Sequence, residues 1–455
     1  MTAPRNVILI ALDTLRADHL SCFGYGRLTS PHIDRLASTG TLFERFYSPH
    51  IPTHPGFTTM HTGRDAFVHG VVSHAGSHVP DEAIPLMAEA LARRGVHTVA
   101  VDNLGRWFTR GFDAYLPFDW DKDPTKPWRK AEAVNAVALG ALDRCAADPR
   151  PFFLFLHYWD PHTPYLPPSP FDRMFVAGDE RDPGERSMDP VWAFEPFRDY
   201  FAQWMDGVTD IRFPVAQYDA EIAYLDTVLA RLFARVEELG LRDDTAIVIV
   251  SDHGEVLDDH VGYFDHHGLY DANLHVPCII SAPGLVPAAH RVSGSASMLD
   301  IAPTVYDALG FPDLSAELGL PGRSLIEVAN GRADCGTISD LYITESTWMR
   351  KRGWRTGQWK LIEALEPDFH DGPPIELYDL STDPGEITNL ASERPEIIAE
   401  LSARMHGYAR RRAAETGVPD PILTSQITLR HIGKMETAVP KDDRLYAEGG
   451  RDRMG

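Results

Sequence analysis

Polar residues that bind metal ions stand directly after two apolar runs of the chain. Asp13 follows residues 7–12, and Asp252 and His253 come just after residues 245–250. Two carboxylates and one imidazole form a ligand set that suits Zn²⁺ or Mn²⁺ and also admits Mg²⁺ or Ca²⁺. Asp13, Asp252 and His253 are therefore candidate ligands of one divalent metal ion, and satisfied polar residues at strand ends are the competing interpretation.

The elements that must bring these residues together follow from the pattern of apolar positions. Residues 7–12, 152–156 and 245–250 are continuous apolar runs, typical of parallel strands covered on both faces. Between them, residues 218–236 carry apolar side chains at helical spacing, and Gly240 is a plausible stop. This alternation indicates a doubly wound α/β sheet. Sites in such sheets lie beyond the carboxyl ends of the strands, so the polar residues are expected at one edge.

Changes in composition suggest the domain organisation. Residues 1–335 are expected to form the catalytic domain, with an irregular, Pro- and Trp-containing insertion at 166–213 that resembles a lid or pocket wall. Residues 336–416 are expected to form a smaller α+β domain, with strands at 342–345, 359–362 and 375–380 and a helix from 395 to about 412. The polar tail, 417–455, either packs on a neighbouring subunit in a homo-oligomer or is loose.

Composition restricts the partners and the compartment. A formal net charge of −23 argues against nucleic acid as a partner, whereas a small anionic substrate stays compatible, since a metal ion can set the local charge. Four widely spaced cysteines predict free thiols. The apolar runs are too short for a signal sequence or a membrane span. A cytoplasmic protein without a membrane partner is therefore the default expectation.

Five segments occur in the order found in a known family. They are an apolar strand ending in an acid (7–18), a helical segment (29–37), Asp-Pro-His-Thr-Pro-Tyr (160–165), Ser-Asp-His-Gly-Glu (251–255) and Leu-Tyr-Asp-Leu with its following turn (377–389). Together they resemble the sulfatase family of the alkaline phosphatase superfamily. The resemblance implies an alkaline phosphatase-like fold with a smaller C-terminal domain, ester hydrolysis, and metal ligands at Asp13, Asp252 and His253.

The position of the nucleophile departs from this family. Sulfatases carry Cys or Ser in a C/S-x-P-x-R segment, whereas residues 53–57 here read Thr-His-Pro-Gly-Phe. Oxidation of Thr53 would give a ketone and not the formylglycine aldehyde. Unmodified Thr53 can complete the metal coordination and take up a phosphoryl group that water then removes. Pro55 is expected as the first residue of a helix, with Thr53 near its positive end; a plain helix cap at Thr53 is the competing interpretation.

Several positions of the family's cationic clamp are also altered. Phe57 stands where the family has Arg, Asn103 stands where it has His, and His266 stands where it has Lys. This altered pattern resembles that of the phosphonate monoester hydrolases and phosphodiesterases of the superfamily. His162 is the predicted residue that binds the substrate anion or protonates the leaving group, with His157, His266 and His267 as secondary candidates or simply polar cleft residues. Asn103 is a candidate donor to a nonbridging oxygen.

These observations predict a metal-dependent hydrolase of phosphodiesters or phosphonate monoesters that acts through a covalent intermediate on Thr53. Three alternatives stay open: a sulfatase that works without formylglycine, a transferase with an acceptor other than water, and a non-catalytic binding protein that kept the fold.

Overall fold

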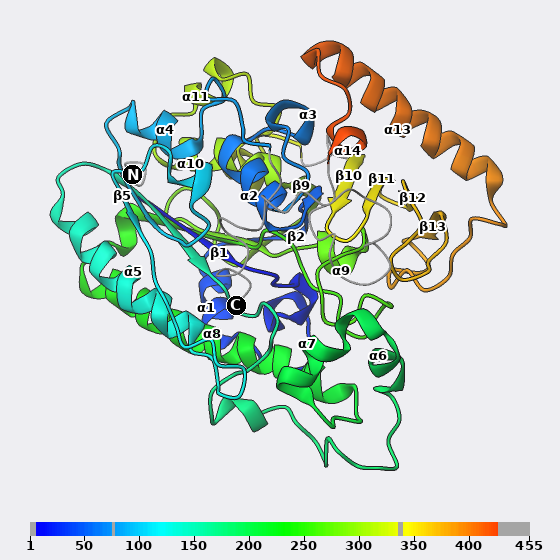
Figure 1. Ribbon diagram of the computed structural model, residues 1–455. Helices are drawn as coiled ribbons and strands as arrows, with labels where there is room; N and C mark the ends of the chain where they lie inside the picture. Colours follow the sequence, from blue (N-terminus) through cyan, green and yellow to red (C-terminus); the bar gives the residue numbers. More distant parts are fainter. Residues whose placement is uncertain (1–5, 75–77, 335–339, 426–455) are drawn as a thin grey trace.

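The computed structural model describes residues 6–74, 78–334 and 340–425 (Figure 1). Its centre is a mixed, mostly parallel sheet in the order β5-β4-β6-β1-β7-β8-β2-β9, in which β8 runs antiparallel to both of its neighbours. The strands are β1 (Asn6–Leu12), β2 (Thr41–Tyr47), β4 (His97–Val101), β5 (Ala114–Leu116), β6 (Phe152–Tyr158), β7 (Thr245–Val250), β8 (Cys278–Ser281) and β9 (His290–Ser297).

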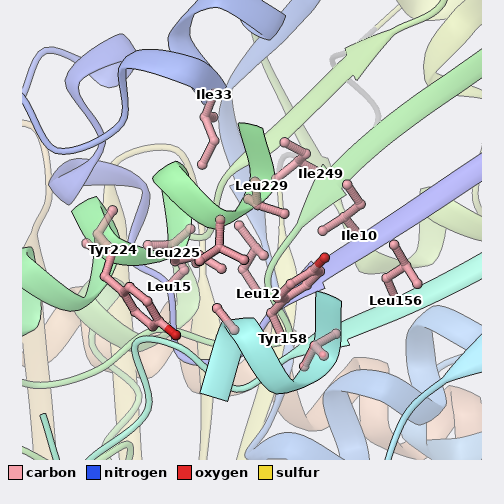
Figure 2. Close-up of a cluster of buried hydrophobic side chains, with 14 of the residues drawn as sticks. Ile10, Leu12, Leu15, Ile33, Leu156, Tyr158, Tyr224, Leu225, Leu229 and Ile249 are labelled. Atoms are coloured by element: carbon pink, nitrogen blue, oxygen red, sulfur yellow. The ribbon is translucent and has the colours of Figure 1, made fainter. Parts of the chain in front are cut away.

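Helices cover both faces of this sheet (Figure 1). Alternate residues of β1 point to opposite faces, so that Ile8 and Ile10 join one apolar core and Val7 and Leu9 the other. Figure 2 shows the first core, in which Ile10 and Leu156 from the strands meet Leu225 and Leu229. The first face carries α1 (Pro31–Ser38), α5 (Lys130–Ala147) and α8 (Arg212–Glu238); the second carries α2 (Thr53–Thr62), α4 (Met87–Ala92) and α10 (Ile301–Ala308).

A smaller antiparallel sheet follows in the C-terminal part and confirms the predicted α+β character. Its strands are β10 (Leu341–Ser346), β11 (Arg350–Arg355), β12 (Trp359–Ala364) and β13 (Ile375–Asp379). Helix α13 (Pro395–Thr416) buries Leu401 and Met405 against it. The short strand β3 (His50–Ile51), from the N-terminal part, pairs in parallel with β10, so the small sheet takes a strand from outside residues 336–416.

The insertion at 166–213 is more ordered than its sequence suggests. It contains α6 (Asp189–Ala193) and α7 (Glu195–Met205), and Phe197, Phe201 and Met205 are buried in the core of the large sheet. The other helices in the described residues are α3 (Ala66–His69), α9 (Asp271–Leu274), α11 (Asp313–Glu317), α12 (Leu325–Ala329) and α14 (Pro421–Thr424), with 3₁₀ turns at Ala17–His19, Ser21–Phe23, Arg106–Thr109, Phe171–Arg173, Arg242–Asp244 and Met298–Asp300.

The fold class predicted from the sequence is confirmed, and the three long apolar runs are the neighbouring strands β6, β1 and β7. Cys22, Cys145 and Cys278 are free thiols as predicted, while Cys335 and tail residues 426–455 lie outside the described residues. Strand β11 was not predicted. Within the described ranges, none of the helices combines the length and apolar character that a bilayer span requires.

Candidate metal centre and active site

Asp13, Asp252 and His253 meet at the carboxyl ends of the adjacent strands β1 and β7. One potential ligand atom from each lies within 4.8 Å of the others, and all three side chains are fully buried. The loops that carry them are fastened together, since Ser251 Oγ donates to His253 O (2.6 Å) and accepts from the Leu15 N–H (3.0 Å). The strand-end position expected from the sequence is therefore what brings these residues together.

The chemistry of this cluster fits a divalent cation. Among the described residues, Asp13 Oδ1 and Asp252 Oδ2 have no hydrogen-bond partner although both are buried. Burial, together with the neighbouring Asp13 charge, raises the pKa of Asp252 well above its usual range. Buried carboxylates that repel each other are costly unless a positive charge compensates them. A bound divalent ion would supply that charge, and Asp13, Asp252 and His253 would hold it.

His253 is in the protonation state that metal binding requires. Its Nδ1 lies 2.9 Å from Gly254 O and therefore carries the proton that it donates to this carbonyl. Burial lowers the pKa of His253 to about 3, so the ring is neutral at physiological pH. The lone pair of Nε2 is consequently available to a metal ion.

Thr53 lies beside this cluster at the start of α2. Its Oγ1 is 3.1 Å from His253 Nε2, and Thr53 is the first residue of a helix of ten residues. Pro55 is thus the third helical residue and not the first, which corrects the sequence prediction, but the hydroxyl does lie at the positive helix end. Gly56 permits the close approach of α2, because a Cβ there would lie 2.7 Å from Asp252 O.

His157 supports the candidate ligand Asp13, a role that the sequence did not reveal. Its Nε2 lies 3.1 Å from Asp13 Oδ2, and its Nδ1 lies 2.7 Å from Asp102 Oδ1. Tyr115 donates its hydroxyl proton to the other Asp102 oxygen. Burial opposes the charged ring, but the two carboxylates outweigh it and raise the pKa of His157 to about 10. His157 is therefore a buried cation that holds Asp13 in place and is not a substrate-binding histidine.

His162 and His266, the predicted residues for proton transfer, lie next to the cluster of candidate metal ligands. The ring centroid of His266 is 4.8 Å from that of His253 and 5.0 Å from that of His162. His162 donates its Nδ1 proton to Thr163 O (2.7 Å), and burial lowers its pKa. Burial opposes the charge on His266, but Asp265 and Glu255 raise its pKa to about 9.

His267 and Asn103 have other contacts. The ring of His267 meets that of His370 in the small domain edge to edge, with centroids 4.5 Å apart, and an Nε2–Nε2 hydrogen bond joins the two rings. Asn103 donates to Phe118 O (2.8 Å) and accepts from the Phe118 N–H (3.1 Å). These contacts assign His267 to the domain boundary and Asn103 to a link between the loop after β4 and Phe118, and they give no support to the predicted roles in catalysis.

Comparison with known proteins identifies the family. Residues 5–311 match the family model described as Sulfatase, and residues 259–411 match the one described as N-sulphoglucosamine sulphohydrolase, C-terminal. Choline-sulfatase of Rhizobium meliloti (strain 1021) is 24% identical over 445 residues, which cover 86% of this chain and 83% of that protein. Arylsulfatase K of Bos taurus is 29% identical over 320 residues, but the match spans 64% of this chain and 55% of that relative.

Solved structures share the fold over almost the whole chain. The phosphonate monoester hydrolase of Agrobacterium radiobacter has a TM-score of 0.69 and 24% identity, and the match covers 91% of this chain and 96% of that one. A 2-O GAG sulfatase has a TM-score of 0.73 and 20% identity, with 92% and 96% covered. Because the Sulfatase model matches well over half of the residues, the chain belongs to the sulfatase family of the alkaline phosphatase superfamily and is a hydrolase of ester bonds.

Proposed function

We propose that this protein is a metal-dependent hydrolase that cleaves small phosphodiesters or phosphonate monoesters through a covalent intermediate on Thr53. One observation carries the proposal: the Thr53 hydroxyl lies 3.1 Å from His253 Nε2, among the candidate metal ligands and at the positive end of α2. A threonine hydroxyl placed there has the environment that an activated nucleophile requires.

The reaction would proceed in two displacements. The Thr53 oxygen forms a bond to phosphorus while the bond from phosphorus to the ester oxygen breaks, and the hydroxyl proton leaves with the departing alcohol. A divalent ion held by Asp13, Asp252 and His253 would lower the pKa of the hydroxyl and offset negative charge. In this proposal His162 or His266, whose rings lie beside His253 and each other, carries the proton. Water then attacks phosphorus and restores Thr53.

The charge around the site favours a substrate with a single negative charge. Three histidines, His157, His162 and His253, surround Asp13, and burial lowers the pKa of the last two. Of these, His157 is already bound between Asp13 and Asp102. A phosphodiester or phosphonate monoester anion requires less compensating positive charge than a dianionic phosphate monoester. The reduced set of positive groups at this site therefore suits the singly charged substrate.

A sulfatase that works without formylglycine is the second candidate. It is supported by the relatives, which include a choline-sulfatase and arylsulfatase K. In such an enzyme water would have to displace sulfate from the Thr53 oxygen, since a single hydroxyl cannot expel sulfate as a geminal diol does. A non-catalytic binding protein is the third candidate, against which the intact cluster of potential ligands argues.

The test compares metal-reconstituted wild type, Thr53→Ser and Thr53→Ala on an aryl phosphodiester, an aryl phosphonate ester and an aryl sulfate. We expect turnover of the phosphorus esters, retained in part by the Ser hydroxyl and reduced at least about 10³-fold in the Ala variant. Turnover of the sulfate ester alone would replace the proposal by the second candidate. An Ala variant as active as wild type would show that Thr53 is not the nucleophile.

A further inference from the structure

We propose a second divalent cation site, formed by Glu255, Asp265 and His266, next to the first centre. Potential ligand atoms of the three side chains lie within 4.8 Å of one another. His266 Nδ1 is 3.3 Å from Asp265 Oδ1 and 3.5 Å from Glu255 Oε1. These separations are close to the edge of a tetrahedron around Zn²⁺, about 3.3 Å for bond lengths of about 2.0–2.1 Å.

The state of Glu255 is the independent observation that points to a cation. Its side chain is 0% exposed, and neither carboxylate oxygen has a hydrogen-bond partner within the described part of the chain. His266 Nδ1, the atom that faces Glu255 and Asp265, likewise has no hydrogen bond to a described residue. A carboxylate with two unsatisfied buried oxygens is costly to desolvate and calls for a positively charged partner.

Geometry favours a cation over a hydrogen bond from His266 as that partner. Asp265 Oδ2 also lies 3.4 Å from His267 Nδ1, whereas His266 Nδ1 is the atom that faces Glu255 Oε1. A cation between the three side chains uses the lone pairs of Glu255, Asp265 and His266 at once, whereas one Nδ1–H cannot satisfy two carboxylates at 3.3 and 3.5 Å with good geometry.

The backbone holds the three residues in this arrangement. Val256 and Asp265 form an isolated antiparallel bridge, with the Val256 N–H donating to Asp265 O (2.9 Å), which fixes residue 255 opposite residues 265 and 266. The Asp265 carboxylate is oriented by the Trp348 indole N–H (3.1 Å) and by the His266 N–H (2.7 Å). Hydrogen bonds of this kind orient carboxylate ligands around metal ions.

The proposed site shares no ligand with the first centre. Glu255 lies two residues after His253, and the rings of His253 and His266 have centroids 4.8 Å apart, so the two cations would be neighbours. One imidazole and two carboxylates suit Zn²⁺ or Mn²⁺. Coordination through Nδ1 leaves the His266 Nε2–H as a hydrogen-bond donor to the substrate, and proton transfer then falls to His162.

The experiment counts metal ions per chain. Full-length protein is stripped with a chelator, reloaded with Zn²⁺ or Mn²⁺, desalted and analysed by elemental mass spectrometry. We expect Glu255→Gln to lower the count by one ion relative to wild type, from two to one. Asp252→Asn, which damages the first centre, should also lose one ion but retain the second. Because these counts need no turnover, a failure of the proposed catalytic role of Thr53 would leave the result unchanged.

Glu345→Gln is the matched control, since Glu345 is also a fully buried glutamate near this region and accepts the Gly268 N–H (2.7 Å). It should keep the wild-type count. If circular dichroism shows that Glu255→Gln does not fold, the number of metal ions bound per chain is measured for Asp265→Asn in its place, and the same loss of one ion is expected. Equal counts for wild type and the decisive variant would overturn the proposal. An anomalous-scattering peak of the loaded metal between Glu255, Asp265 and His266 would support it directly.

Discussion

Nε2 of His157 lies 3.1 Å from a carboxylate oxygen of Asp13, so a candidate metal ligand on β1 is held by a side chain from the neighbouring strand β6. The same ring is fixed on its other side by Asp102, at the end of β4. Three adjacent strands thus contribute one buried chain of acid, imidazole and acid that ends at the proposed metal.

This relationship predicts an effect on metal affinity. His157→Gln should weaken metal binding about 10–100-fold, because Asp13 loses a charged neighbour that orients it. A competition titration against a chromophoric chelator measures the change. His275→Gln is the control, since its Nε2 contacts Glu44 O (2.8 Å) away from the centre and a glutamine can replace that contact. An unchanged affinity in His157→Gln would show that Asp13 does not need this support.

A second prediction concerns proton transfer to the leaving group. His162→Ala should slow the hydrolysis of alkyl esters by about 10²-fold or more and the hydrolysis of p-nitrophenyl esters only a few-fold. The difference is expected because a poor leaving group depends on protonation. The slope of log kcat against leaving-group pKa measures this. His267→Ala should leave the slope unchanged, since His267 contacts His370 and Asp265. Equal slopes in wild type and His162→Ala would remove His162 from this role.

The insertion should contribute to stability as well as to any pocket wall that it forms. Phe201 is 1% exposed and packs edge-on against Trp204 and Phe264, with ring centroids 6.3 and 6.2 Å away. We expect Phe201→Ala to destabilise the protein by about 3–5 kcal/mol, measured by chemical denaturation. Gln203→Ala, on the exposed side of the same helix, should cost less than about 0.5 kcal/mol. Similar small effects for both would mean that the insertion is loosely attached.

The buried His61 predicts a loss of stability in acid. Burial among Phe108 and Phe155 lowers its pKa to about 4 from the usual 6.5. Between these two values the unfolded chain binds the proton and the folded chain does not, so the free energy of unfolding falls as pH falls. This contribution reaches about 3 kcal/mol. His61→Leu should reduce the change in the free energy of unfolding between pH 6.5 and pH 4 by this amount. An equal change in wild type and variant would contradict the lowered pKa of His61.

The sequence sufficed for the doubly wound α/β class, for the three neighbouring strands β6, β1 and β7 of the large sheet, and for the grouping of Asp13, Asp252 and His253. Each of these residues follows a long apolar strand, and the edge at which parallel strands end is fixed by the fold class. The helix that carries Thr53 was also expected, although its first residue was placed two positions too late.

Contacts that depend on the register between distant segments could not be predicted in this way. The Asp102–His157–Asp13 chain requires the alignment of β4, β6 and β1, and a histidine at the end of a strand gives no signal of its partners. The bridge between Val256 and Asp265 likewise has no sequence pattern. Strand β11, rich in Arg and Lys, lacks the apolar alternation that marked its neighbours.

Strand β3 ends two residues before Thr53 and hydrogen-bonds to β10 in the small sheet. The position of the proposed nucleophile is therefore set jointly by both parts of the chain. The two parts are not interchangeable modules: an N-terminal fragment that ends before β10 would lack the strand on which β3 rests, and a chimaera that carries a foreign C-terminal sheet would have to recreate this pairing to place residue 53 correctly.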